Sequence, residues 1–373
     1  MSDSSRDGGR APGAFSRAEI LSQPESWSLC LTKLEKSGLL RLVAERFAGA
    51  GGWLFIGCGS SYYAALAAAA SMTALSGKAA HALPASELLL YPDVSLAAAA
   101  ERVPVLISRS GRTSEVLKAA ELLKSRHIPA LAITCAPGQP LGDRAEMSIV
   151  LPDADEQSTV MTRSFSSMLL VLQALAAVLA RKSEFWNALL RMPALAATAF
   201  QPIPDRIAGF VSRQQFADYV FLGQGPFYGL ACEYALKVTE MALCYAQSFH
   251  TLEFRHGPKS IVGPETLVVF LLSENSYPAE CELLVEMKAL GSTTMVVTNQ
   301  ADERARAAAD FLVELALDVP ELARLAAYLF PGQLLGLCTG LQKGLNPDLP
   351  RNLSRVVTLD DETSPENREP ARP

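Results

Sequence analysis

The chain has 373 residues, of which 49% are hydrophobic and 19% are charged, so it is long enough to bury the cores of two lobes or of one large α/β domain. A net charge of −6 argues against nucleic acid as a main partner, because binding to phosphate backbones requires a basic face. The seven cysteines are odd in number and scattered, and the four histidines do not cluster, so neither a disulfide framework nor a metal site is predicted.

Both ends of the chain are polar, and we expect disorder over residues 1–15 and over the acidic, proline-rich residues 360–373. The first residues contain no apolar segment of the kind found in a signal peptide. The most apolar stretch, residues 168–180, is shorter than the roughly 20 residues that a membrane-spanning helix needs. Together with cysteines of the reduced type, these features predict a cytoplasmic protein with no membrane partner.

In chain order, the first predicted element is a helical segment over residues 27–51. A short apolar strand then begins at Trp53 and leads through a Gly-Cys-Gly turn into a long alanine-rich helix. Glycine suits such a turn because it reaches positive φ and lets the helix N-terminus approach a ligand. Further strands are predicted over residues 104–108 and 130–134, with a helix over 115–124 between them. Strands that alternate with helices of this length predict parallel βαβ units.

The second half of the chain repeats this order after a helical segment over residues 164–189. Four positions of the first strand–turn–helix unit recur in the second, where Phe55, Gly57, Gly59 and Tyr62 align with Phe221, Gly223, Gly225 and Tyr228. Strands over residues 266–273 and 294–298 follow, separated by a helix over 279–290.

This duplication predicts an α/β fold of two tandem flavodoxin-like lobes, each a parallel sheet sandwiched by helices. We place the first lobe, with its helical N-terminal segment, at residues 16–195 and the second at residues 196–359. The ligand is expected beyond the carboxyl ends of the strands, where the βα loops gather.

A candidate phosphate site follows the strand over residues 104–108. The loop Ser108-Arg-Ser-Gly-Arg-Thr-Ser114 offers four hydroxyls and a glycine at a helix N-terminus, where backbone N–H groups and the helix dipole favour an anion. Ser60 and Ser61 begin the neighbouring helix and offer further donors. The alternative is an ordinary Ser/Thr helix cap, but one capping hydroxyl does not explain the whole pattern. Because the corresponding loop of the second half has no glycine and carries an acid, we predict one phosphate site per chain.

Candidate proton-transfer groups lie in the second half. Lys237 and Glu240 are three residues apart on a predicted helix and share one face, with Glu233 one turn earlier. The surrounding run is apolar, so these charges are expected to be largely buried, and burial raises a carboxylate pKa. The alternative is a solvated Glu-Lys stripe. Downstream, His256 precedes a Gly-Pro turn, and imidazole titrates near neutral pH.

These motifs together resemble the sugar isomerase (SIS) family over about residues 16–358. They are Phe-Ile-Gly-Cys-Gly-Ser-Ser-Tyr, Ile-Ser-Arg-Ser-Gly-Arg-Thr-Ser-Glu, Met-Thr-Arg-Ser-Phe, Glu-Tyr-Ala-Leu-Lys-Val-Thr-Glu, Glu-Phe-Arg-His-Gly-Pro-Lys-Ser and Asn-Pro-Asp-Leu-Pro-Arg-Asn-Leu. Within the family, the chain is similar to the isomerase half of glucosamine-6-phosphate synthases, to tagatose-6-phosphate ketose/aldose isomerases and to amino-sugar-phosphate deaminases.

The resemblance implies a role for each candidate. The expected phosphate ligands are Ser60, Ser61, Ser108, Ser110 and Thr113, with Arg109 beside them. Glu240 would move the proton between C1 and C2 of the sugar, and Lys237 would assist it. His256 would open the sugar ring in the site of the adjacent subunit, which implies a homodimer with shared active sites. Such chemistry needs no cofactor.

Two differences from the glucosamine-6-phosphate synthases narrow the expected activity. The synthases begin with a catalytic cysteine in a glutaminase domain, whereas this chain begins Met-Ser and leaves no room for one, so we expect no use of glutamine. Where the synthases carry an imine-forming lysine near the C-terminus, this chain has Arg355, and arginine does not form imines at ordinary pH.

The leading prediction is therefore a phosphosugar aldose/ketose isomerase or an amino-sugar-6-phosphate deaminase-isomerase. A glutamine-independent synthase-like enzyme and a fructosamine-phosphate deglycase remain as alternatives. A non-catalytic, sugar-phosphate-binding regulator is the other class. The two lobes and the presence of both Glu240 and His256 favour an enzyme.

Overall fold

The computed structural model describes residues 10–97 and 101–359. It contains two five-stranded sheets in which every strand pair is parallel. The first sheet has the order β2-β1-β3-β4-β5, and its strands are β1 (Gly52–Gly57), β2 (Ala79–Pro84), β3 (Arg102–Ile107), β4 (Leu131–Thr134) and β5 (Met147–Val150). The second sheet has the order β10-β9-β8-β6-β7, and its strands are β6 (Asp218–Gly223), β7 (Ala246–Phe249), β8 (Thr266–Leu271), β9 (Thr293–Thr298) and β10 (Phe311–Glu314). Read from its other end, the second order is β7-β6-β8-β9-β10, which matches the first strand for strand. This match confirms the predicted pair of flavodoxin-like lobes.

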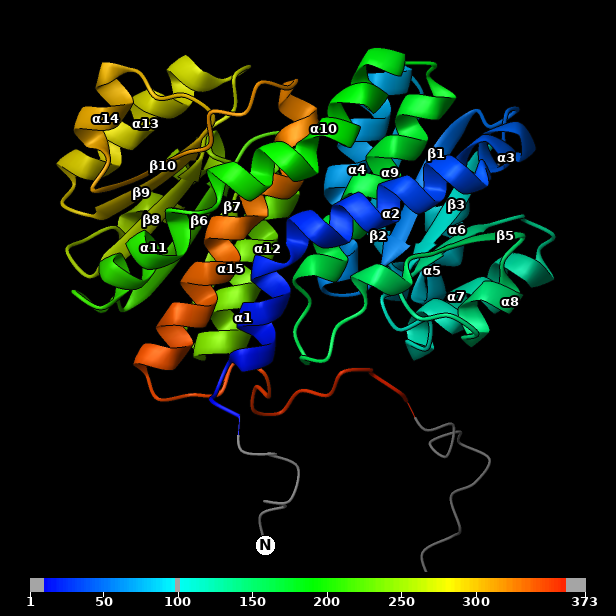
Figure 1. The fold of residues 1–373 in the computed structure, drawn as a ribbon, viewed down its shortest axis with the longest axis horizontal. Helices are drawn as coiled ribbons and strands as arrows, with labels where there is room; N and C mark the ends of the chain where they lie inside the picture. Colours follow the sequence, from blue (N-terminus) through cyan, green and yellow to red (C-terminus); the bar gives the residue numbers. More distant parts are fainter. Residues whose placement is uncertain (1–9, 98–100, 360–373) are drawn as a thin grey trace, which may run out of the picture.

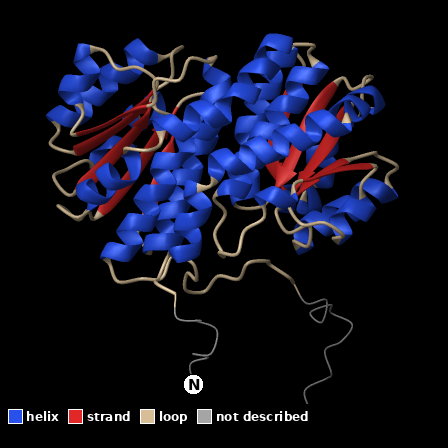
Figure 2. Ribbon diagram, viewed as in Figure 1, coloured by secondary structure: helices blue, strands red, loops and turns tan. Residues whose placement is uncertain are grey.

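Helices cover both faces of each sheet (Figure 2). In the first lobe they are α1 (Ala14–Leu21), α2 (Gln23–Ser37), α3 (Leu39–Arg46), α4 (Ser60–Ser76), α5 (Ala85–Leu90), α6 (Pro92–Ala97), α7 (Ser114–Ser125), α8 (Pro140–Arg144) and α9 (Arg163–Leu179). The remaining helices are α10 (Ser183–Ala199), α11 (Ile203–Val211), α12 (Phe227–Ala242), α13 (Tyr277–Ala289), α14 (Glu303–Ala308) and α15 (Leu325–Gln342), and four short 3-10 turns, η1 to η4, lie between elements. No helix within the described residues is long and apolar enough to cross a bilayer.

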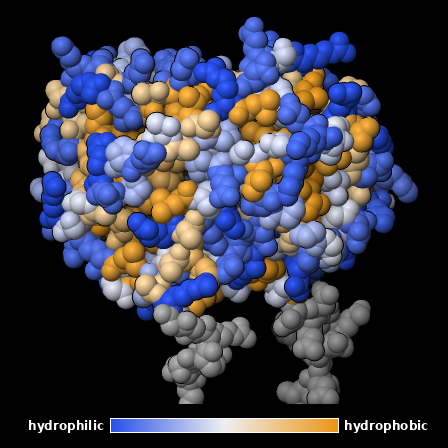
Figure 3. Space-filling view, in the orientation of Figure 1, coloured by the Kyte–Doolittle hydropathy of each residue, from blue (hydrophilic) through white to orange (hydrophobic). Residues whose placement is uncertain are grey.

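One apolar core joins the two lobes. Alternate residues of each strand point to opposite faces of its sheet, so Phe55 and Phe221 enter the central core, whereas Leu54 and Val220 enter the separate outer cores. The helices α4, α9, α12 and α15 fill the space between the sheets (Figure 1). On the face seen in Figure 3, polar side chains surround several apolar patches on both lobes.

The candidate functional residues of the two lobes are brought together by the close approach of α4 to α12. A Cβ atom at Gly229 of α12 would lie 2.6 Å from the backbone oxygen of Tyr63 of α4, so only glycine allows this spacing. The two helices that follow the equivalent glycine turns of the two lobes therefore pack against each other. As a result, the beginning of α4 faces the middle of α12.

The structure refines several predicted boundaries. The segment over residues 27–51 is two helices, α2 and α3, and the segment over residues 164–189 is divided between α9 and α10 at Arg181, whose φ is 54°. α1 already begins at Ala14, inside the stretch expected to be disordered, and the backbone N–H of Phe15 donates to Asp348. The rest of the predicted disorder falls on residues 1–9 and 360–373, which lie outside the described residues.

Candidate active site

A cavity of about 180 Å³ lies at the carboxyl ends of β1 and β3. Five segments contribute its lining: the turn that begins α4, the loop before α7, the loop before α9, helix α12 and the chain near residue 355. Its lining residues are Cys58, Gly59, Ser60, Ser61, Arg109, Ser110, Thr113, Thr159, Met161, Glu240, Ser354, Arg355, Val356 and Val357. The cavity thus brings together Glu240 of the second lobe and most of the phosphate-loop residues of the first.

The predicted phosphate loop turns sharply at a glycine and directs two of its hydroxyl residues to the cavity. Gly111 has a φ of 62°, and a Cβ atom there would lie 2.8 Å from Cβ of Gln139, so the turn requires glycine. Thr113 is the N-cap of α7, yet its side chain makes no capping hydrogen bond. Its Oγ1 lies 3.0 Å from Oγ of Ser108, which is itself buried and does not line the cavity. The Ser/Thr pattern is therefore not used to cap this helix, and Ser110 and Thr113 line the cavity.

Arg109 also lines the cavity, but its guanidinium is engaged within the protein. Nη1 donates to the backbone oxygen of Val160 at 3.2 Å and lies 3.4 Å from the Glu156 carboxylate, while Nη2 donates to the backbone oxygens of Thr159 and Arg355 at 3.0 and 2.8 Å. The side chain is only 5% exposed. The geometry thus makes Arg109 a support for two lining segments, and it lies beside the predicted phosphate ligands.

Helix α12 carries a network of charges. Nζ of Lys237 lies 2.5 Å from Oε2 of Glu240, 3.2 Å from Oε1 of Glu233 and 3.4 Å from Oγ of Ser60. The side chains of Lys237 and Glu233 are fully buried, and that of Glu240 is 18% exposed. The predicted shared face is therefore present, and the solvated Glu-Lys stripe is excluded.

The complete burial of Glu233 strongly affects the pKa of its carboxyl group. Burial raises the pKa of Glu233 to about 7, against the lowering effects of Lys237 and Ser60, and the charge of Glu240 adds to the rise. Burial alone would lower the pKa of Lys237, but the two carboxylates outweigh it and raise this pKa above its usual value. The sequence argument that burial raises a carboxylate pKa in this helix therefore holds for Glu233.

Ser60 and Ser61 are not equivalent. The hydroxyl of Ser60 donates to Oε1 of Glu233 at 3.0 Å, so it faces the charged network. Oγ of Ser61 has only a 3.9 Å contact with the sulfur of Met161. Ser61 thus keeps a hydroxyl available on the phosphate side, whereas Ser60 is committed to the network on α12.

The C-terminal segment closes one side of the cavity, and it runs beneath the first lobe in Figure 1. The Arg355 side chain pairs with Asp155 at 2.6 Å, and its backbone oxygen accepts from Arg109 at 2.8 Å. The backbone N–H of Ser114, in the first turn of α7, donates to the oxygen of Val357 at 3.2 Å. Residues 354–357 thus contact the helix N-terminus that the phosphate site is predicted to use.

His256 does not line this cavity. It follows the 3-10 turn η2 (Leu252–Arg255) of the second lobe and is exposed to solvent. The other three histidines, His81, His127 and His250, are also absent from the lining. The structure of one chain therefore does not bring an imidazole to Glu240.

The second lobe fills its equivalent loop with its own carboxylate. The backbone N–H of Ser273 donates to Oε2 of the fully buried Glu280 at 2.8 Å, and the hydroxyls of Ser273 and Thr251 donate to the same carboxyl group at 3.0 and 2.9 Å. These donors are unavailable to a ligand. A single phosphate site per chain stays a prediction.

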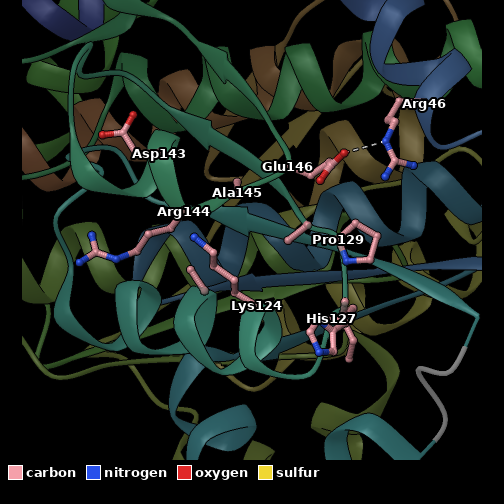
Figure 4. A pocket seen from close by; sticks show the side chains of 11 residues that line it. Arg46, Lys124, His127, Pro129, Asp143, Arg144, Ala145 and Glu146 are labelled. Carbon is pink, nitrogen blue, oxygen red and sulfur yellow. Dashed lines mark hydrogen bonds and ion pairs between the residues drawn. The ribbon is translucent and has the colours of Figure 1, made fainter.

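A larger hollow of about 610 Å³ lies at the opposite, amino end of the first sheet, where Pro129 and Ala130 precede β4 (Figure 4). Three of its charged side chains are paired, since Arg46 lies 2.9 Å from Glu146 and Arg144 pairs with Glu121 outside the hollow. No set of groups converges on one point as it does at Glu240. Within the described residues, no group of three or more His, Cys, Asp or Glu side chains is arranged to hold a metal.

Sequence reasoning missed Thr159, Met161 and residues 354, 356 and 357 of the lining. Thr159 and Met161 come from the irregular loop before α9, which has no regular periodicity to mark it. The one available signal was the Met-Thr-Arg-Ser-Phe motif that begins at Met161. Cys58 also lines the cavity, but burial and Glu115 raise the pKa of its thiol to about 11, so it stays protonated.

The SIS domain family model matches residues 47–178 and 218–329, which include every strand of both sheets. The chain therefore belongs to the SIS domain family, as its motifs predicted.

Among its relatives, the isomerizing glutamine–fructose-6-phosphate aminotransferase of Pyrobaculum aerophilum is 27% identical over 357 residues, which cover 93% of this chain and 58% of that protein. The enzyme of the same name from Shewanella oneidensis is 30% identical over 326 residues, or 82% of this chain and 51% of that protein. This chain thus spans about half the length of these curated relatives.

Two solved structures have the same architecture. Glucosamine-6-phosphate deaminase from Thermotoga maritima is 29% identical with a TM-score of 0.74, and the match covers 93% of this chain and all of that chain. Tagatose-6-phosphate ketose/aldose isomerase from Escherichia coli has a TM-score of 0.77 at 22% identity, covering 95% of this chain and 100% of that chain, a likeness of fold alone. The relatives and neighbours are sugar-phosphate isomerases, deaminases and aminotransferases, which favours an enzyme over a regulator.

Proposed function

We propose that this protein is a phosphosugar isomerase that transfers a proton between C1 and C2 of a hexose or hexosamine 6-phosphate. The proposal rests on one cavity that holds a carboxylate, Glu240, together with the hydroxyls of Ser61, Ser110 and Thr113. The phosphate binds at the N-terminus of α7, where the helix dipole and backbone N–H groups favour an anion. Fixing the phosphate holds the other end of the sugar near Glu240, so that proton transfer becomes effectively intramolecular.

In this proposal Glu240 transfers the proton and Lys237 positions Glu240. Glu240 takes the carbon-bound proton from one of the two adjacent carbons and returns it to the other through an enediol. The ammonium of Lys237, 2.5 Å from this carboxylate, orients it toward the cavity. No cofactor is required for this reaction.

An amino-sugar substrate is favoured by two observations. The deaminase from Thermotoga maritima is 29% identical and matches over its whole length. The position of an imine-forming lysine holds Arg355, whose guanidinium pairs with Asp155. A deaminase-isomerase that releases ammonia through the enediol needs no such lysine, and we therefore prefer it to a synthase-like activity or a deglycase.

The imidazole that opens the sugar ring comes from a second subunit in this proposal. No histidine lines the cavity of one chain, and His256 is exposed on the second lobe. A homodimer in which His256 reaches the partner's cavity supplies the missing acid.

All seven cysteines are free thiols, and four of them are buried. Thiols persist in a reducing compartment, which supports a cytoplasmic location. In an oxidising compartment the partly exposed Cys244 and Cys338 would be open to oxidation.

The test is a panel of hexose and hexosamine 6-phosphates, with ammonia and ketose phosphate measured separately. We expect ammonia and fructose 6-phosphate from glucosamine 6-phosphate, with no consumption of glutamine. Glu240→Gln is the matched inactive variant, because it keeps the size of the side chain. Calorimetric binding of a sugar phosphate without turnover of any member would contradict the enzyme and favour a regulator.

A further inference from the structure

The hydroxyl of Ser60 lies on the boundary between the cavity and the buried charges of α12. Ser60 lines the cavity and is 6% exposed, and its Oγ donates to Oε1 of the fully buried Glu233 at 3.0 Å. It is the one hydroxyl of the lining that is hydrogen-bonded to Glu233 within the described residues. Ser60 therefore has a hydroxyl that a ligand can reach, and this hydroxyl is hydrogen-bonded to a carboxyl group that a ligand cannot reach.

An enediol reaction moves two protons, and Glu240 accounts for only one of them. When a carbonyl moves from C1 to C2, the carbon-bound proton moves from C2 to C1, and a second proton must leave the oxygen on C2 and reach the oxygen on C1. Proton transfer between such atoms requires a group within hydrogen-bond reach or a short chain of them.

Lys237 is poorly placed for this second proton. An ammonium group has three N–H donors, and Lys237 has three acceptors: Glu240 at 2.5 Å, Glu233 at 3.2 Å and Ser60 at 3.4 Å. The two carboxylates raise its pKa against the effect of burial, so it holds its proton. The thiol of Cys58 is also a weak candidate, because burial raises its pKa to about 11.

We propose that Ser60 and Glu233 form a proton relay for the sugar's oxygen atoms, separate from the carbon-bound proton handled by Glu240. In the starting state the carboxyl proton of Glu233 is on Oε1, so the hydrogen bond runs from Glu233 to Ser60. As Glu240 removes the proton from C2, Ser60 gives its hydroxyl proton to O1 and receives this proton from Oε1. When Glu240 protonates C1, the O2 proton passes to Ser60, and the Ser60 proton returns to Glu233. Each group ends the cycle as it began, and no other reactant is needed.

The surroundings of Glu233 permit both of its protonation states. Its Oε2 is buried and has no hydrogen-bond partner among the described residues, which costs less for a neutral carboxyl group than for a carboxylate. The groups that face it are Lys237 and Glu240 on α12 and Ser60 and Tyr63 on α4, while α15 presents Gly336 to the Lys237 backbone. Burial raises the pKa of Glu233 to about 7, so it exchanges a proton readily near neutrality.

This inference rests on the proposed isomerase function, and the test uses the full-length protein with the best substrate of the panel. Ser60→Ala and Glu233→Gln each break the relay while leaving Glu240 in place. We expect kcat to fall roughly 10²-fold with KM changed less than about threefold, because the relay acts on proton transfer rather than on phosphate binding. Ser60→Thr keeps a hydroxyl and should recover most of the lost rate.

Isotope effects separate a relay from a structural role. With the relay broken, the oxygen-bound proton becomes limiting, so the rate effect of deuterium at C2 should shrink and the solvent deuterium effect should grow. In Glu240→Gln the C2 effect should stay large. We expect kcat of the wild type to decline above about pH 7, where Glu233 loses its proton, and Glu233→Gln should lose this decline.

The matched controls are Ser71→Ala, a buried hydroxyl further along α4 that contacts Gln173, and Glu280→Gln, a fully buried carboxyl group of the second lobe. Neither should change the isotope effects or the pH profile. An active wild type whose Ser60→Ala and Glu233→Gln variants keep its rate and profile would overturn the relay alone. Equal losses in Ser60→Thr and Ser60→Ala would also overturn it. A wild type that turns over no sugar phosphate would instead overturn the proposed function.

Discussion

The Oγ of Ser60 donates a 3.0 Å hydrogen bond to Oε1 of Glu233, and this bond joins α4 of the first lobe to α12 of the second. It can form only because Gly229 lets the two helices approach closely. The two copies of the repeat have therefore diverged into complementary halves of one site. The first copy supplies the loop that we propose binds the phosphate, and the second supplies the carboxyl groups and the lysine.

The first prediction concerns stability and pH at Glu233. A folded pKa near 7, against 4.5 as the ordinary value, means that the folded chain holds this proton more tightly than the unfolded chain does. The contribution is therefore fully present below about pH 4.5 and is lost as the pH rises to 7, on the order of 3 kcal/mol in all. Glu233→Gln cannot titrate, so its stability relative to the wild type should rise between pH 5 and pH 8.

Urea unfolding of both proteins at several pH values measures this difference. Glu282→Gln, an exposed carboxylate on α13, is the control and should track the wild type at every pH. A constant stability difference between Glu233→Gln and the wild type from pH 5 to pH 8 would show that Glu233 does not titrate in this range.

A second prediction assigns the carbon-bound proton to Glu240. Glu240→Gln keeps the hydrogen-bonding shape beside Lys237 but removes the base, so kcat should fall by about 10²- to 10⁴-fold while sugar-phosphate binding survives. Steady-state kinetics and calorimetry on the same preparation measure the two effects. Full activity in Glu240→Gln would remove the proposed mechanism.

The third prediction tests the phosphate loop. Ser110→Ala or Thr113→Ala should raise KM strongly with a smaller effect on kcat, because these donors hold the substrate and the transition state alike. Ser125→Ala, at the far end of the same helix, is the control, since its hydroxyl bonds only to the oxygen of Leu122. Unaltered calorimetric affinity for a sugar phosphate in both loop variants would place the phosphate elsewhere.

Arg109 gives a prediction about stability. Arg109→Met leaves Glu156 buried without its positive partner and leaves the backbone oxygens of Thr159, Val160 and Arg355 without this donor. Removing one member of a buried ion pair costs about 3–5 kcal/mol, so the variant should unfold at markedly lower urea concentration. Arg112→Met, an exposed arginine of the same loop, should change stability by less than about 0.5 kcal/mol. Comparable stability of the two variants would contradict the supporting role.

Residue patterns predicted the central strands and missed the edges of both sheets. β1, β3, β4, β6, β8 and β9 are buried on both faces and read as continuous apolar runs. The missed strands β2, β5, β7 and β10 all lie at sheet edges, where half-exposed residues such as His81 and Gln247 interrupt the pattern. Local composition carries little signal where one side of a strand is open to solvent.

The candidate site was likewise predictable only in part. The common face of Lys237 and Glu240 follows from helical spacing, which is local and visible in the sequence. The orientation of Ser60 toward Glu233 depends on how α4 crosses α12. One N–H group of Arg109 donates to the backbone oxygen of Arg355, which is 246 residues away. Both depend on tertiary packing, so short-range patterns contain no information about them.

The final prediction concerns sharing of the site between subunits. If His256 completes the cavity of a partner, mixing Glu240→Gln with His256→Asn protein should create mixed dimers in which one of the two sites has both wild-type groups. At equal amounts and with free subunit exchange, this gives about one quarter of the wild-type sites. Activity should therefore appear on mixing, although each variant alone is nearly inactive.

Subunit exchange must be measured separately, for example by fluorescence transfer between labelled chains. Mixing two preparations of Glu240→Gln is the control and should restore nothing, because no mixed dimer then contains the base. His256 lies exposed on the second lobe, away from the lining of its own chain's cavity, so recovery through sharing is the expected result. Confirmed exchange with no recovered activity would mean that each subunit opens the sugar ring without its partner, and that His256 has another role.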